Sequence, residues 1–145
     1  MNKLYRNKKC PKCGSYLNRG LSNDAIILKK GLILLILRKI DPYKGHWALP
    51  GGMVDWDETI PQSVVREVKE ETSLTVTELT LLGVYSQPKR HPQQAVAIAY
   101  IAKTRGTPKA GDDAQEYKYF PLDNLPTPLA FDHEEIIEDY IRLVK

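Results

Sequence analysis

Three glutamates share one face of a predicted helix. Glu67, Glu70 and Glu71 lie three or four positions apart or side by side, which makes them neighbours on a helix of 3.6 residues per turn. Like charges at this spacing cost a few tenths of a kcal/mol per pair unless a cation compensates. Glu58 precedes the helix and joins the group if the 51–52 loop folds back, since its two glycines let the backbone approach an ion closely.

Several carboxylates and a backbone carbonyl are the oxygen ligands that Mg²⁺ or Mn²⁺ prefers. Such a site keeps positions open for water and for substrate phosphates. It can neutralise a pyrophosphate, orient an attacking water and lower the pKa of that water. The residues therefore indicate metal-assisted hydrolysis of a phosphoanhydride. The alternative interpretation is a solvated helix face on which Arg66 and Glu70 form an i, i+4 pair.

The wider pattern favours the metal site. Residues 52–74 follow the spacing G-x5-E-x7-R-E-U-x-E-E-x-G-U, in which U is an apolar residue, and the chain resembles the Nudix family over about residues 24–145. Ser73 stands where this pattern has its second glycine, and Asp57 replaces a glycine often found before the first glutamate. Ser73 weakens the left-handed cap that glycine supplies at a helix end, but neither change removes a ligand.

The resemblance implies an α/β fold, an α/β/α sandwich with a mixed β-sheet. It also implies hydrolysis of a nucleoside diphosphate linked to another moiety, with Mg²⁺ or Mn²⁺ as cofactor. Arg66 would orient a glutamate. The metal ligands implied by position are the carbonyl of Gly52 and the side chains of Glu58, Glu67, Glu70 and Glu71.

Substrate choice depends on residues outside this pattern. Residues 84–88, 111–114 and 129–134 resemble microbial ADP-ribose pyrophosphatases, which favours hydrolysis of ADP-ribose to AMP and ribose 5-phosphate. Three alternatives stay open. They are an NADH or dinucleotide pyrophosphatase, a triphosphatase for oxidised nucleotides, and a non-catalytic Nudix regulator that senses a ligand or binds nucleic acid.

The catalytic acids implied by the resemblance are Glu70 and an acid from a distal loop. We expect the loop at 111–116 to provide the second, with Glu116 ahead of Asp112 and Asp113. A solvated turn is an equally good interpretation of any one of these three.

Candidate substrate-binding residues lie apart from the glutamates. Arg38 and Arg90 could contact phosphates, and Phe131 could stack on a base. Surface positions for the arginines and core packing for Phe131 are the alternatives. His91 and His133 are expected to be surface histidines.

Cys10 and Cys13 are the only cysteines, and with Gly14 they look like one knuckle of a zinc ribbon. A complete zinc site needs four ligands. Zn²⁺ here would therefore require histidines or a partner chain, and the other interpretation is a remnant that binds nothing.

Among the elements that must position these residues, strands outnumber helices, and one strong helix lies between the strands. A mixed sheet covered by helices is the economical arrangement. Asp132 is the expected N-cap of the last helix. Apolar runs predict strands at 25–28, 32–38, 47–49, 74–85, 95–103 and 117–121, and helical spacing predicts helices at 60–71 and 132–144.

Composition fits one globular domain, with 145 residues, 42% of them hydrophobic and 27% charged. We expect a basic segment at 1–22 and the hydrolase domain at 23–145. Residues 1–50 carry eleven Lys or Arg against two Asp, and the acidic residues gather after Gly51.

The longest apolar run, 31–37, is too short to span a bilayer. We expect a cytoplasmic protein with a small nucleotide substrate, no membrane partner, no nucleic-acid partner and a possible homodimer.

Overall fold

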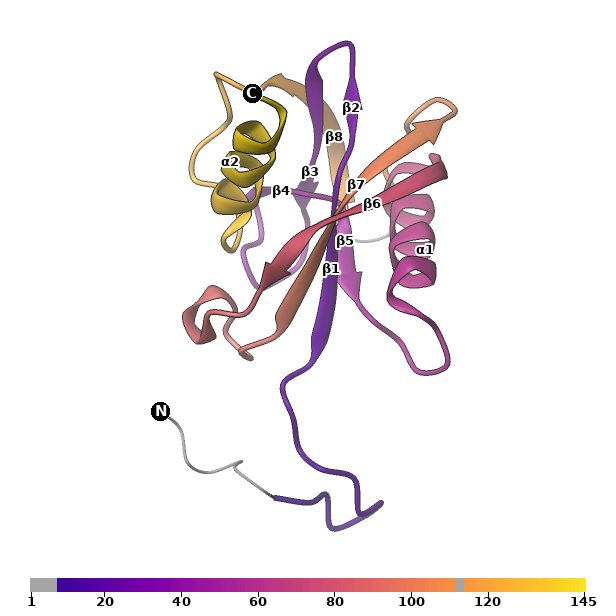
Figure 1. Ribbon diagram of the computed structural model, residues 1–145, viewed down its shortest axis with the longest axis vertical. Coiled ribbons are helices and arrows are strands. Elements are labelled where there is room, and N and C mark those ends of the chain that lie inside the picture. Colours follow the sequence, from indigo (N-terminus) through magenta and orange to yellow (C-terminus); the bar gives the residue numbers. More distant parts are fainter. Residues whose placement is uncertain (1–7, 112–113) are drawn as a thin grey trace.

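The computed structural model describes residues 8–111 and 114–145. Two helices lie on opposite sides of a central layer of strands, in a three-layer α/β/α arrangement (Figure 1). The elements in chain order are β1 (Leu21–Ile26), β2 (Leu28–Lys29), β3 (Leu32–Arg38), β4 (Trp47–Ala48), β5 (Gly51–Met53), α1 (Ile60–Thr72), β6 (Thr75–Tyr85), the 3-10 helix η2 (Pro88–Arg90), β7 (Val96–Arg105), β8 (Ala114–Pro121) and α2 (His133–Val144).

The strands form two sheets, and the first is mixed. Its order is β5-β1-β7-β6, with β1 parallel to β7 and antiparallel to β5. In the second sheet, β3 pairs antiparallel with β2, β4 and β8. The predicted fold class, an α/β sandwich with a mixed sheet, is confirmed.

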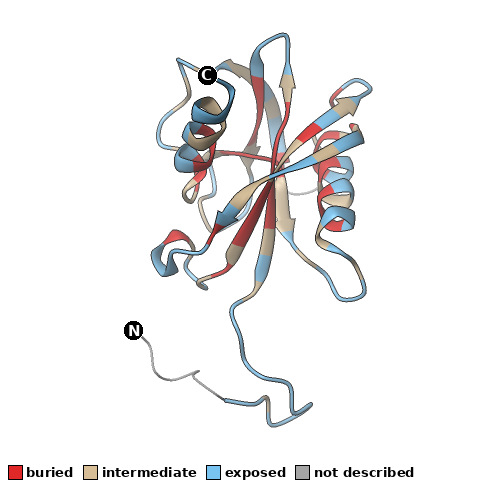
Figure 2. Ribbon diagram, in the orientation of Figure 1, coloured by how far each residue is buried: buried red, intermediate tan, exposed pale blue. Residues whose placement is uncertain are grey.

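The core divides between the two faces of the strand layer, as period-2 strands require. Leu34 and Ala25 pack with Val64 and Val68 of α1. The apolar residues next to Leu34 and Ala25 in their strands point to the other face and pack with Ile136 and Ile137 of α2. Both faces of β3 are therefore covered, which explains its continuous apolar sequence. Figure 2 shows the buried residues concentrated along the central strands and the inner sides of the helices.

Helix α1 begins with a reciprocal cap. The Thr59 hydroxyl accepts the Gln62 N–H at 3.2 Å, and the Gln62 side chain accepts the Thr59 N–H at 2.8 Å. The helix ends at Ser73, whose φ of 62° is left-handed although serine, and not glycine, stands there. Val65 of this helix is 41% exposed, whereas Val64 and Val68 are buried.

Two local expectations were wrong, and a third is confirmed in position but not in its hydrogen bond. Residues 51–53 pair with β1 as strand β5, where a turn was predicted. Strand β8 begins at Ala114, so Glu116 lies within a strand opposite Leu37 and not in the predicted loop. Asp132 stands at the N-cap of α2 but makes no side-chain capping bond.

The Asp132 carboxylate bonds Arg90 instead, and this pair belongs to a buried charge network. Its two oxygens accept from Arg90 Nε at 2.8 Å and Nη2 at 2.7 Å. Asp24 lies 3.8 Å from Arg90 Nη2 and 3.1 Å from His133 Nε2. Nδ1 of His133 accepts the Leu49 N–H at 2.9 Å. The network ties β1, η2, the β4–β5 connection and α2 to one another.

No helix in the described part of the chain combines the length and the apolar character needed to cross a membrane.

Replacing Arg90 with Met should lower the free energy of unfolding by about 3–5 kcal/mol, because Asp24 and Asp132 would stay buried without their cation. Urea unfolding measures this change. Exposed Lys89 supplies the matched control, and Lys89→Met should stay within about 0.5 kcal/mol of wild type. Equal stability of the two variants would show that the buried charges need no pairing.

Candidate functional site

Arg66 sits at the centre of the glutamate cluster on α1. Its Nη1 lies 2.7 Å from Glu67 Oε1 and 3.1 Å from Glu70 Oε2. Its Nε and Nη2 donate to the two oxygens of Glu58 at 3.0 and 2.7 Å, a bidentate pair, and Nη2 also donates to Met53 O at 3.1 Å. One guanidinium therefore offsets the repulsion among three carboxylates and fixes where each one lies.

The cluster shifts two pKa values in opposite directions. The Arg66 guanidinium, helped by the Asp55 N–H, lowers the pKa of Glu58 to about 2. Burial raises the pKa of Glu67 above its usual range, against the pull of Arg66. A carboxylate that is poorly solvated in its charged form gains most from an additional cation nearby, so Glu67 is the strongest candidate for a metal ligand.

Two glycines let β5 lie directly against α1. The Gly51 N–H donates to Glu71 Oε2 at 2.9 Å, and Glu71 is only 3% exposed. A Cβ on Gly52 would lie 2.4 Å from Glu67 Oε1, and one on Gly51 would lie 2.0 Å from the backbone oxygen of Asn23. The backbone of β1 therefore requires glycine at position 51, and a side chain at position 52 would displace the Glu67 carboxylate.

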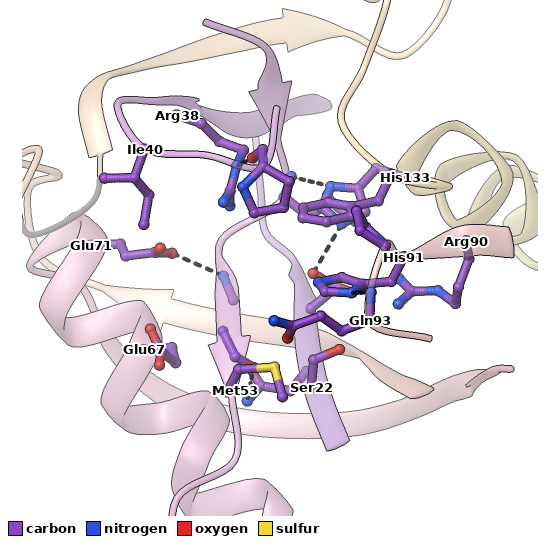
Figure 3. A pocket seen from close by; sticks show the side chains of 18 of the residues that line it. Ser22, Arg38, Ile40, Met53, Glu67, Glu71, Arg90, His91, Gln93 and His133 are labelled. Atoms are coloured by element: carbon purple, nitrogen blue, oxygen red, sulfur yellow. Dashed lines mark hydrogen bonds and ion pairs between the residues drawn. The ribbon is translucent and has the colours of Figure 1, made fainter. Parts of the chain in front are cut away.

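These residues form one wall of a cavity of about 530 Å³. Figure 3 shows Glu67 and Glu71 reaching toward it from α1, with Arg38 and Ile40 above and Arg90, His91, Gln93 and His133 opposite. Met53 and Ser22 lie along its lower edge in that view. The cavity therefore has an acidic wall and a facing wall that carries arginines and imidazoles.

All three predicted substrate-binding residues line this cavity. Arg38 donates from Nε to Pro42 O at 2.8 Å and lies 5.0 Å over the ring of Phe131. Phe131 adopts a left-handed φ of 53° and is half-buried. Arg90 is already engaged by Asp132 and Asp24. The structure thus brings the three together, while their contacts with a substrate stay a prediction.

Several further cavity residues were not predicted, and four of them are polar groups on or beside β1, η2 and α2. They are Asn23, Asp24, His91 and His133. His133 is 2% exposed and Asp24 is 6% exposed, so neither is a surface residue. The sequence offered only the place of Asp24 just before a predicted strand and the prolines near His91, and neither signal indicates a cavity.

Glu116 does not reach the cavity. It is exposed on β8 and is not among the lining residues. Asp112 and Asp113, the other acids considered for the distal loop, lie outside the described residues.

The cysteine pair forms a turn but no recognisable zinc site. The Gly14 N–H donates to Cys10 O at 2.9 Å, and Cys10 and Cys13 are both free thiols. Within residues 8–111 and 114–145, no three His, Cys, Asp or Glu side chains stand together as a metal cage. The structure therefore gives the zinc hypothesis no support.

The glutamate cluster has the donor chemistry of a divalent-cation site, although its side chains now face Arg66 and the Gly51 N–H. Its oxygens are hard ligands on a cavity wall, which suits Mg²⁺ or Mn²⁺. Asn23 Oδ1, in the same cavity, is buried and accepts no hydrogen bond from any described residue. Such an atom can accept from a bound water or ligand.

Comparisons with known proteins agree with this chemistry. A family model described as the NUDIX domain matches residues 20–140. The chain is 49% identical over 142 residues to an ADP-ribose pyrophosphatase of Methanocaldococcus jannaschii, an alignment that covers 97% of this chain and 83% of that protein. It is 30% identical to the NAD-capped RNA hydrolase NudC of Pseudomonas aeruginosa over 81% of this chain, but it spans only 42% of that relative.

Solved structures give the same fold. The NUDIX domain of Shewanella oneidensis NrtR, complexed with ADP ribose, has a TM-score of 0.81 and 27% identity, over 100% of this chain and 99% of that one. A MutT NUDIX hydrolase of Burkholderia pseudomallei has a TM-score of 0.79 and 34% identity, over 85% and 98%. A bifunctional enzyme of Francisella tularensis, complexed with AMP and a manganese ion, has a TM-score of 0.70 and 26% identity, over 88% and 42%.

The two glycines should differ when each is changed to Ala. Gly51→Ala forces β5 away from β1 and should cost about 1–3 kcal/mol of unfolding free energy, as overpacking does. Gly52→Ala meets only the flexible end of Glu67, so stability should change by less than about 1 kcal/mol. The displaced carboxylate should instead weaken Mn²⁺ binding about 10- to 100-fold. Urea unfolding and a Mn²⁺ titration of both variants measure this, and equal effects on stability would contradict it.

The bidentate pair with Arg66 should disappear in Arg66→Lys, so the pKa of Glu58 should rise from about 2 toward its usual value. Because this pKa is lowered in the folded protein, the pair stabilises the fold at neutral pH, and that stability is lost as pH falls from about 4.5 to about 2. Carboxyl-carbon NMR titration gives the pKa directly. An unchanged Glu58 titration in the variant would exclude Arg66 as the cause.

Proposed function

The chain belongs to the NUDIX family, and from that premise we propose that it hydrolyses the pyrophosphate bond of ADP-ribose to give AMP and ribose 5-phosphate. The oxygen of water bonds to one phosphorus atom, and the bond from that phosphorus to the bridging oxygen breaks. One proton of the water must leave during this step. The oxygen that leaves stays on the other phosphate.

One observation carries the proposal. Glu67 and Glu71 line one wall of a cavity of about 530 Å³ together with Gly51 and Gly52, and Arg66 links Glu67 to Glu58 and Glu70 beside it, in a chain 49% identical to an ADP-ribose pyrophosphatase. A structural ion-pair cluster has no need of a glycine whose missing Cβ leaves room for a carboxylate. The close packing of Gly52 on Glu67 makes sense where a backbone carbonyl and a carboxylate share one ion.

Mg²⁺ or Mn²⁺ bound here would neutralise the pyrophosphate and acidify the attacking water. The ligands in this proposal are the Gly52 carbonyl and the side chains of Glu58, Glu67, Glu70 and Glu71. Glu71 is held in place by the Gly51 N–H at 2.9 Å. Arg66 is a positioning residue, because it orients Glu58, Glu67 and Glu70 through its own contacts.

Glu70 is the proton acceptor in this proposal. Its side chain is 41% exposed, the most open of the three glutamates bound by Arg66, so water reaches it readily. Glu116 stays the alternative acceptor, and it would have to reach the cavity from an exposed position on β8. Arg38 and Arg90 are proposed on the phosphate side and Phe131 on the base side.

Several accompanying proposals concern the whole chain. Residues 1–22 form a basic segment and 23–145 the hydrolase domain, in a cytoplasmic protein that forms a homodimer. Cys10 and Cys13 would hold Zn²⁺ only with ligands from elsewhere, such as a partner chain.

A substrate panel tests the function. With Mg²⁺ or Mn²⁺, we expect ADP-ribose to be cleaved to AMP and ribose 5-phosphate, and Glu70→Gln should lower turnover about 10²- to 10⁴-fold. Glu78→Gln is the control, since Glu78 pairs with Lys103 on the exposed side of β6. Chromatography identifies the products.

Other outcomes of the panel identify the alternatives. Cleavage of NADH in preference to ADP-ribose would indicate a dinucleotide pyrophosphatase, and release of inorganic pyrophosphate from an oxidised nucleotide would indicate a triphosphatase. The proposed reaction would be contradicted if no substrate of the panel were hydrolysed, or if Glu70→Gln kept full activity.

A further inference from the structure

We propose that the imidazole of His91, seated on the ring of Phe131, is the surface on which the adenine of the substrate stacks. This inference rests on the proposed function and makes it more specific. His91 becomes the residue that recognises the base, and Phe131 becomes its support.

Phe131 is itself firmly placed. The Tyr43 ring meets it edge-on at 4.7 Å, and the Arg38 guanidinium lies 5.0 Å from its centroid. The His91 ring lies 5.1 Å away, with an angle of 3° between the two ring planes. Two parallel rings already form an offset stack here, and a flat purine is the substrate group that would extend it.

A hydrogen bond fixes the orientation of the imidazole. His91 Nδ1 accepts the Gln93 N–H at 3.0 Å. The neutral ring then carries its proton on Nε2, where it can donate to an acceptor of the base. Burial and the nearby charges of Arg90 and Arg38 lower the pKa of His91, which keeps the ring neutral at physiological pH.

His91 lies in the part of the cavity that is far from the glutamates, where the base and not the pyrophosphate would lie. Figure 3 shows His91 on the side opposite Glu67 and Glu71, so a substrate whose pyrophosphate lies at the glutamates extends its end groups toward this wall. Arg90, proposed above as a phosphate contact, precedes His91, but its guanidinium is engaged by Asp132 and by Ala95 O, and a phosphate would have to compete with them. The aromatic stack is therefore what this part of the wall offers a ligand.

Trp56 is the competing platform. It is 90% exposed in the loop between β5 and α1, and it does not line the cavity. If the base instead lay outside the cavity, Trp56 would be the aromatic residue to hold it.

Two variants separate the ring of His91 from its hydrogen bond. His91→Phe keeps an aromatic ring and loses the acceptor for Gln93, whereas His91→Asn keeps an acceptor and loses the ring. His46→Ala is the control, since His46 also contacts Tyr43 edge-on at 5.5 Å but does not line the cavity. Trp56→Ala tests the competing platform. Circular dichroism checks that each variant is folded.

The readout is calorimetric binding of AMP and of ribose 5-phosphate to the full chain with Mg²⁺ present. We expect His91→Asn to weaken AMP about 5- to 100-fold, the usual effect of losing a base stack, and to leave ribose 5-phosphate within about 2-fold. His91→Phe should keep AMP affinity within about 3-fold, and His46→Ala and Trp56→Ala should match wild type.

Three results would overturn the inference. They are weaker AMP binding in His91→Phe but not in His91→Asn, weaker binding of ribose 5-phosphate in place of AMP, and loss of AMP binding in Trp56→Ala alone. Because binding is measured without turnover, these results are independent of the substrate panel. Hydrolysis of ADP-ribose with the wrong binding pattern would contradict only the role of His91.

Discussion

The crowding of carboxylates at the start and along one face of α1 is the constraint on which this structure depends. Glu58, Glu67 and Glu70 repel one another, and Arg66 holds all three within 2.7–3.1 Å of its nitrogens. The helix, the loop before it and β5 are then arranged around that guanidinium, whose Nη2 also reaches Met53 O. One cation built into the chain therefore offsets part of the negative charge beside the cavity.

The close approach of β5 to α1 follows from the same arrangement. Glu71 is buried because the Gly51 N–H replaces the water it would otherwise bind. Glu67 is buried with less compensation, and its pKa rises accordingly. The two buried glutamates therefore differ in their need for a cation. The backbone N–H of Gly51 already satisfies Glu71, whereas Glu67 would still be stabilised by a bound cation.

The sequence predicted the glutamate face well because the spacing of residues along a helix determines which side chains lie next to one another. Elements with clear apolar patterns were also predicted, including the strand at 32–38, which is β3. Apart from Arg90, the facing wall was not predicted, because it forms from η2, β1 and the start of α2, which only tertiary pairing brings together. Asp132 shows why: its position suits a cap, but Arg90, forty-two residues away, competes successfully for its carboxylate.

Because Asp132 bonds Arg90 and does not cap its own helix, α2 is tied to the cavity wall as well as packed on the strand layer. Separating the helix from the layer would break its pair with Arg90 and free the His133 acceptor from the Leu49 N–H. Asp24 would lose a partner at the same moment. The last helix and the inner wall of the cavity are therefore coupled through one set of buried charges, so loosening either one removes partners from the other.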